Sequence, residues 1–100
     1  MANGDTRNAL RLAAEARAFV QERDWEQFHS ARNLAMALSV EAAELLELFL
    51  WTRDDGPQPA TPERATRTAD EAADVLLCLL NFCDRAGIDL EQAFIDKLAK

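Results

Sequence analysis

Residues 61–87 read TPERATRTADEAADVLLCLLNFCDRAG and hold both ends of one long helix. Thr61 is a favourable N-cap, and Pro62 suits the first helical position because the backbone N–H that it lacks is not needed there. Gly87 suits the position just after a helix, where the backbone enters the left-handed region. No glycine or proline lies in between, so the sequence predicts one helix that ends at residue 86.

Three further helices are expected outside this stretch. Residues 6–24 carry small and apolar side chains at helical spacing, with Asp5 as the candidate N-cap. Residues 30–49 are rich in Ala and Leu, which are strong helix formers. A last helix opens with Asp89 and Gln92, a pair that resembles a capping box. The chain has no tyrosine and few β-branched residues, so we expect an all-α bundle of four helices.

The two middle helices are joined by residues 52–61, TRDDGPQPAT, a polar stretch rich in helix breakers that predicts a loop. The helices on either side then form an antiparallel hairpin. We expect its core to consist of apolar side chains from both helices, namely Leu34, Leu38, Leu45, Leu46, Leu48 and Phe49 against Val75, Leu76, Leu79, Leu80 and Phe82.

The composition limits the classes of function. One hundred residues with 49 % apolar content predict a single globular domain over residues 1–100, and self-association would extend its modest core. The net charge of −7 argues against a nucleic-acid polymer as partner, because such proteins need a basic patch. No apolar run reaches the roughly 18 residues that span a bilayer, and no signal peptide follows Met1, so we expect a cytoplasmic protein without a membrane partner.

The sequence indicates neither a disulfide nor a zinc site. Cys78 and Cys83 point about 140° apart on a helix, so we expect two buried free thiols. His29 is the single histidine, and no group of Cys and His has zinc spacing.

Acidic residues recur at helical spacing on both middle helices. Glu41, Glu44 and Glu47 are three residues apart, and Glu71 and Asp74 repeat that spacing. Residues three apart share a helix face, so two packed helices would bring these carboxylates together. Like charges so close repel unless a cation lies between them, and Mg²⁺ or Mn²⁺ prefers carboxylate oxygens.

The same spacing is typical of a solvated helix face, and this alternative stays open. Two features favour the metal site. No Lys or Arg stands four residues after any acid of the two E-x-x-E/D pairs, as it usually would on a charged surface. The acids are also separated by small residues that would permit close helix packing: Ala42, Ala43, Ala72 and Ala73.

Aromatic and polar residues precede the second helix. Residues 23–33, RDWEQFHSARN, combine Trp25 with amide and imidazole groups, which can stack on a planar base and bind its edges. Trp51 supplies a second indole at the far end of that helix. Taken alone, each tryptophan is more typical of a partly buried core anchor, and His29 of a packing or capping residue.

Taken in order, W-x-x-F-H, E-x-x-E-x-x-E, Trp51 and E-x-x-D resemble the MazG-like all-α nucleoside triphosphate pyrophosphohydrolases, and most closely their small dCTP pyrophosphatase branch. The family pattern is E-E-x-x-E, a spacer and E-x-x-D. Val40 stands in place of the first Glu of this pattern, and the dCTP pyrophosphatase branch also lacks that Glu. The resemblance covers roughly residues 16–97, and Lys97 and Leu98 match the start of a C-terminal segment that the family continues with Asn and a basic-Tyr-Pro tail.

The resemblance implies an enzyme that hydrolyses a deoxynucleoside triphosphate, with dCTP or a modified analogue as the expected substrate, to the monophosphate and pyrophosphate. It implies a homodimer or dimer of dimers that removes unwanted nucleotides. Mg²⁺, or alternatively Mn²⁺, would be held by Glu41, Glu44, Glu71 and Asp74. We expect Glu44 or Glu47 to act as general base on the attacking water.

The nucleotide would lie between Trp25 and Trp51, with hydrogen bonds from amide or imidazole groups and phosphate contacts from Arg32 and Lys97. Cys78 stands where the branch often has a tyrosine near the substrate. The expected substrate-binding residues are Trp25, Glu26, Gln27, Phe28, His29, Arg32, Asn33, Trp51, Cys78 and Lys97.

Two other functions stay open. One is a non-catalytic helical interaction module, whose acidic faces are merely solvated and whose tryptophans bind a partner helix. The other is a related phosphohydrolase that shares the metal site and acts on a different diphosphate or triphosphate.

Overall fold

The computed structural model describes residues 6–25, 27, 29–52 and 61–100. It contains four helices, and no strand occurs among these residues. The helices are α1 (Thr6–Glu22), α2 (Ala31–Glu47), α3 (Pro62–Ala86) and α4 (Leu90–Ala99). The prediction of an all-α chain with four helices is therefore confirmed, and each predicted end lies within a few residues of the observed one.

The helix ends are fixed by capping residues, of which the sequence indicated Thr61, Gly87 and Asp89 but not Ser30. The side chains of Ser30, Thr61 and Asp89 each accept a hydrogen bond from the backbone N–H three residues later, at 3.0, 3.2 and 3.1 Å. Gly87 ends α3 with φ of 72°, a left-handed conformation that favours glycine. Asp5, the candidate cap of α1, lies outside the described residues.

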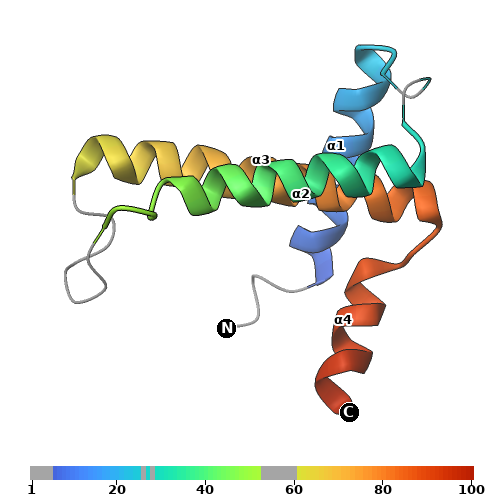
Figure 1. Cartoon of the computed structure of the whole chain (residues 1–100). Helices are drawn as coiled ribbons and strands as arrows, with labels where there is room; N and C mark the ends of the chain where they lie inside the picture. Colours follow the sequence, from blue (N-terminus) through green and yellow to red (C-terminus); the bar gives the residue numbers. More distant parts are fainter. Residues whose placement is uncertain (1–5, 26, 28, 53–60) are drawn as a thin grey trace.

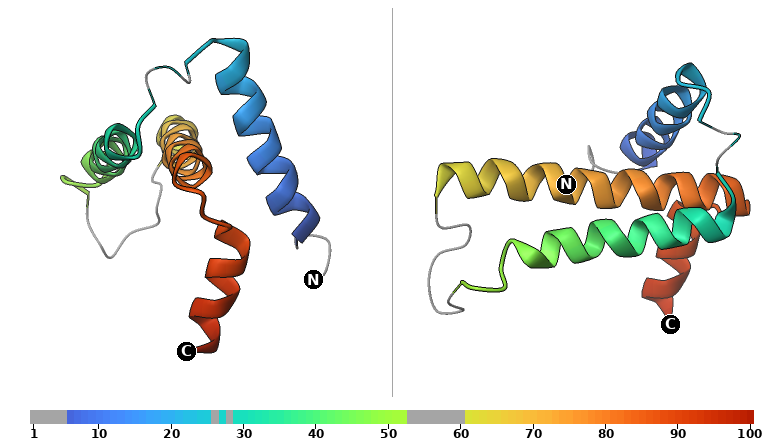
Figure 2. Two further views of the ribbon diagram at one scale, coloured as in Figure 1. Left: turned by 90° about the vertical axis from the view of Figure 1, so that its right-hand side faces the viewer. Right: turned by 45° about the horizontal axis from the view of Figure 1, so that its top comes forward.

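The α2–α3 hairpin forms the body of the fold. Figure 1 shows the two helices running antiparallel side by side, with α1 crossing behind the C-terminal half of α3. Arg17 of α1 donates a hydrogen bond from Nε to Asp84 Oδ1 of α3 at 3.0 Å, which ties the two helices together. In both views of Figure 2, α4 extends away from the hairpin.

The core is small and lies along the contact of α3 with α1 and α2. Its most buried members in the described chain are Ala16, Val20, Leu34, Leu48 and Cys83. Both cysteines are free, as predicted, although Cys78 is only half-buried. No described helix has the length and apolar character needed to cross a membrane.

Two predictions about the hairpin core are wrong. Leu46 is 60 % exposed and Leu76 is also exposed, because each is turned by about 100° from the inward residue beside it. The alanines between the acids do not mediate close packing either. All four face solvent in this chain: Ala42, Ala43, Ala72 and Ala73.

Candidate active site

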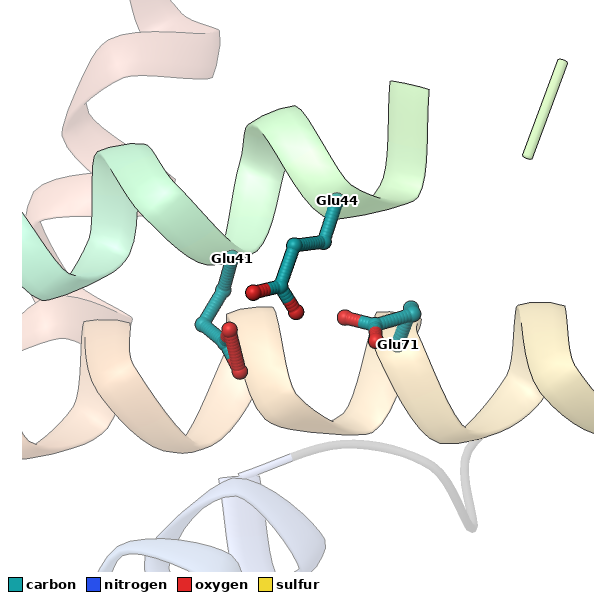
Figure 3. Close-up of side chains that lie close together, drawn as sticks. All are labelled: Glu41, Glu44 and Glu71. Atoms are coloured by element: carbon teal, nitrogen blue, oxygen red, sulfur yellow. The ribbon is translucent and has the colours of Figure 1, made fainter. Parts of the chain in front are cut away.

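Three carboxylates meet between the two helices of the hairpin. The inward stripe of α2 passes through Leu38 and Leu45, and Glu41 occupies the turn between them. Glu44 follows on the same side, and Glu71 faces both from α3 (Figure 3). Each of the three glutamates offers a carboxylate oxygen within 4.8 Å of the others. We call Glu41, Glu44 and Glu71 the acidic cluster.

Burial and repulsion by neighbouring carboxylates raise the pKa values of Glu41 and Glu71. The pKa of Glu41 is raised above its ordinary value of 4.5, first by desolvation and then by the charges of Glu44, Asp74 and Glu71. The pKa of Glu71 is raised by desolvation and by Glu44 and Asp74. The hairpin thus holds these carboxylates together against their own charge.

The donors of the acidic cluster fit a hard divalent cation. They are all carboxylate oxygens, which Mg²⁺ and Mn²⁺ prefer. Glu71 Oε2 is buried and has no hydrogen-bond partner, so it retains an unused acceptor at this position. Asp74 adds charge to the site through its effect on Glu41 and Glu71, although its carboxylate lies outside the 4.8 Å group.

A pocket of about 530 Å³ adjoins the acidic cluster, and this volume falls within the usual range of small-molecule sites. Glu44, Glu47 and Glu71 form its acidic part, and Trp51 lines it with a side chain that is 94 % exposed. The remaining lining residues are Leu48, Leu50 and Arg67. The pocket therefore combines carboxylates with an accessible indole, and Arg67 is a member that sequence reasoning did not identify.

Trp25 and Gln27, two of the other predicted nucleotide contacts, precede α2, at the end of that helix opposite Trp51. Trp25 packs edge-to-face on Phe19 of α1, with ring centroids 5.4 Å apart. The guanidinium carbon of Arg23 lies 3.6 Å from the centroid of the same Phe19 ring. Gln27 donates its side-chain hydrogen bonds to Asp24, at 3.1 and 3.2 Å. The end of α1 and the stretch that follows it therefore form a local cluster of aromatic and polar side chains.

His29 is half-buried and lines a smaller pocket of about 120 Å³. The same pocket contains the Arg17–Asp84 ion pair that ties α1 to α3. Its other lining residues are Val20, Asn81 and Arg85. This pocket is too small for a nucleotide, and none of the three residues of the acidic cluster lines it.

The remaining predicted residues are distributed along the chain. Arg32 and Asn33 are exposed in the first turn of α2, and Lys97 is exposed in the last turn of α4. Cys78 lies closest to the acidic cluster, and its thiol pKa is raised by burial and then by the charges of Glu41 and Asp74. Glu26 and Phe28 lie outside the described residues.

Within a single chain, Trp25 and Trp51 are too far apart to flank the same base. Trp25 precedes α2 and Trp51 follows it, and 17 helical residues extend over about 25 Å. Two rings that flank one base lie roughly 7–8 Å apart, twice the ordinary contact distance. One chain therefore offers one of these indoles to a given base.

Residues 36–100 match the model of the MazG-like family. The chain belongs to the MazG-like family. It is 47 % identical over 90 residues to dCTP pyrophosphatase 1 of Mus musculus and 44 % identical to that of Homo sapiens; each alignment covers 88 % of this chain and 51 % of the relative. The chain thus spans about half the length of these curated relatives.

A solved structure shares the fold of this chain. The crystal structure of a pyrophosphatase from Archaeoglobus fulgidus superposes with a TM-score of 0.73 at 36 % identity, over 92 % of this chain and 86 % of the other.

The raised pKa values predict how metal-free stability depends on pH. A carboxyl group that binds its proton more tightly in the folded state stabilises the fold below its ordinary pKa of 4.5. That contribution is lost as the pH rises through the raised pKa values of Glu41 and Glu71. In EDTA, we therefore expect Glu41→Gln and Glu71→Gln to have a higher melting temperature than the parent at pH 7. Their melting temperatures should also decrease less steeply than that of the parent as the pH rises above 4.5.

Glu15→Gln, at an exposed position on α1, is the matched control and should follow the parent. Melting curves should be measured from pH 4 to pH 8. If the melting temperatures of Glu41→Gln and Glu71→Gln change with pH as that of the parent does, the proposed repulsion among the carboxylates is wrong.

Proposed function

We propose that this chain hydrolyses a deoxynucleoside triphosphate to the monophosphate and pyrophosphate, with dCTP or a modified analogue as the first candidate. The observation that carries this proposal is the acidic cluster next to a pocket lined by Trp51. The choice of dCTP is supported by the names of relatives that are 44–47 % identical over most of this chain. Removal of unwanted nucleotides in the cytoplasm would be the cellular role.

Glu41, Glu44 and Glu71 would hold the metal, with Asp74 as a fourth ligand if its side chain turns inward. A bound Mg²⁺ or Mn²⁺ supplies positive charge against the triphosphate and lowers the pKa of a bound water. The carboxylate oxygens that would bind the metal come from two helices. The distances between them therefore depend on how the two helices of the hairpin pack.

Glu47 is the preferred general base of the two candidates. It lines the pocket beside Glu44 but lies outside the acidic cluster, so its carboxylate is not needed as a ligand. In the proposed step, Glu47 accepts a proton from water as the water oxygen bonds to the α-phosphorus. The bond from that phosphorus to the bridging oxygen breaks, and the electron pair leaves with pyrophosphate.

The two indoles can act on one nucleotide only if they come from different chains. We therefore propose a homodimer, alone or within a dimer of dimers, in which Trp25 of one copy approaches the pocket that contains Trp51 of the other. Two observations support self-association. Trp51 is almost fully exposed, and α4 exposes Phe94, Ile95 and Leu98 on a helix that extends from the hairpin (Figure 1).

The enzymatic proposal predicts release of pyrophosphate from dCTP in the presence of Mg²⁺. Glu47→Gln should lower kcat by about 10²–10⁴-fold, the usual contribution of a general base, with little change in Mg²⁺ affinity. Glu41→Gln should weaken Mg²⁺ binding by at least about tenfold, since even groups outside the ligand shell contribute that much. Pyrophosphate release and calorimetric Mg²⁺ titration measure the two effects.

Glu15→Gln should match the parent in both assays. A folded parent that releases no pyrophosphate from any deoxynucleoside triphosphate would contradict the enzymatic function and favour the non-catalytic module. Full activity in both cluster variants, Glu41→Gln and Glu71→Gln, would contradict the metal assignment.

Shared sites predict complementation between inactive chains. Trp25→Ala and Trp51→Ala chains should each lose most activity alone. Mixed in equal amounts and allowed to exchange subunits, they should form hybrid dimers in which about one quarter of all sites contain both indoles. Activity should rise on mixing, and sedimentation should give a mass above the 11.2 kDa of one chain. A monomer in solution, or no gain on mixing, would contradict the shared site.

A further inference from the structure

The pocket beside the acidic cluster has an uneven distribution of charge. Among the described residues that line it, Glu44, Glu47 and Glu71 are anionic, and Arg67 is the single cation. A polyphosphate cannot approach three carboxylates without positive charge. One divalent cation leaves much of a triphosphate's negative charge uncompensated, so a cationic side chain in the pocket has a specific use.

Arg67 is placed to supply that charge. It lies on α3 four residues before Glu71, so both side chains project from the same side of the helix. The side chain is exposed, and it forms no ion pair or hydrogen bond with a described residue although three carboxylates share its pocket. Its guanidinium group is therefore available to an anionic ligand.

The neighbouring turns of α3 add unused polar groups. Arg64 Nε, Thr68 Oγ1 and Glu71 Oε2 are buried and have no hydrogen-bond partner. Their spacing of four and three residues places them on one stripe of α3. The Arg64 guanidinium carbon lies 5.9 Å from the centroid of the Phe49 ring, which places it at the end of the hairpin where α2 stops. The segment before Glu71 thus carries two guanidinium groups, on Arg64 and Arg67, beside polar atoms with spare hydrogen-bonding capacity.

We propose that Arg67 binds a phosphate group of the substrate and gives the pocket its preference for polyphosphates over monophosphates. The proposal rests on the function proposed above and adds a substrate-binding residue to it. A guanidinium group can donate two parallel hydrogen bonds to phosphate oxygens, which a lysine cannot do in the same geometry. The carboxylates bind the cation, and Arg67 binds the anionic oxygens that the cation leaves uncompensated.

Calorimetric titration can test this assignment on the full chain. The ligands are Mg²⁺ alone, and then dCMP and a non-hydrolysable α,β-imido analogue of dCTP in the presence of Mg²⁺. Arg67→Ala should weaken binding of the triphosphate analogue by about 10–100-fold, the usual contribution of a charge-assisted hydrogen bond, and should weaken dCMP binding much less. Arg67→Lys should lie between Arg67→Ala and the parent. Mg²⁺ affinity should be equal or higher in Arg67→Ala, because a nearby positive charge is removed.

Arg11→Ala, at an exposed position on α1, is the matched control and should bind all ligands like the parent. If the parent binds the analogue and Arg67→Ala binds it equally well, the role of Arg67 is wrong while the proposed function stands. An equal loss of Mg²⁺ and analogue binding in Arg67→Ala would also overturn it, by indicating a structural role. If the parent binds Mg²⁺ but not the analogue, the proposed function fails and this assignment fails with it.

Discussion

Repulsion among carboxylates that the α2–α3 hairpin holds together is the constraint on which the rest of the structure depends. Glu41 occupies a turn of α2 between two inward leucines, where an apolar residue would add to the core. Burial and like charge raise the pKa values of Glu41 and Glu71, so the metal-free chain forgoes stability at neutral pH. The small buried core and the short contact with α1 must compensate for that loss.

Much of the fold could be predicted because helix ends are encoded locally. Ser30, Thr61 and Asp89 cap helices through a bond to a backbone group three residues away, and Gly87 ends α3 by its own backbone conformation. The meeting of Glu41, Glu44 and Glu71 followed from their spacing and from the antiparallel pairing of two helices. These features need no information about distant parts of the chain.

Features that depend on the rotation and length of helices could not be predicted in the same way. Leu46, Ala42 and Ala43 face solvent because the inward stripe of α2 passes through Leu38, Glu41, Leu45 and Leu48. Trp25 and Trp51 both offer an indole ring, but the length of α2 keeps the two rings apart within one chain. Arg67 could have been found from its position four residues before Glu71, since that spacing places two side chains on one helix face.

The central claim is that carboxylates from α2 and α3 together bind one divalent-cation centre. A crystal of the parent chain grown with Mn²⁺ and measured near the manganese absorption edge tests it most directly. The account predicts an anomalous peak between Glu41, Glu44 and Glu71, with oxygens from both helices bound to the metal. A well-occupied Mn²⁺ peak elsewhere, or none while these three side chains turn outward into solvent, would contradict it.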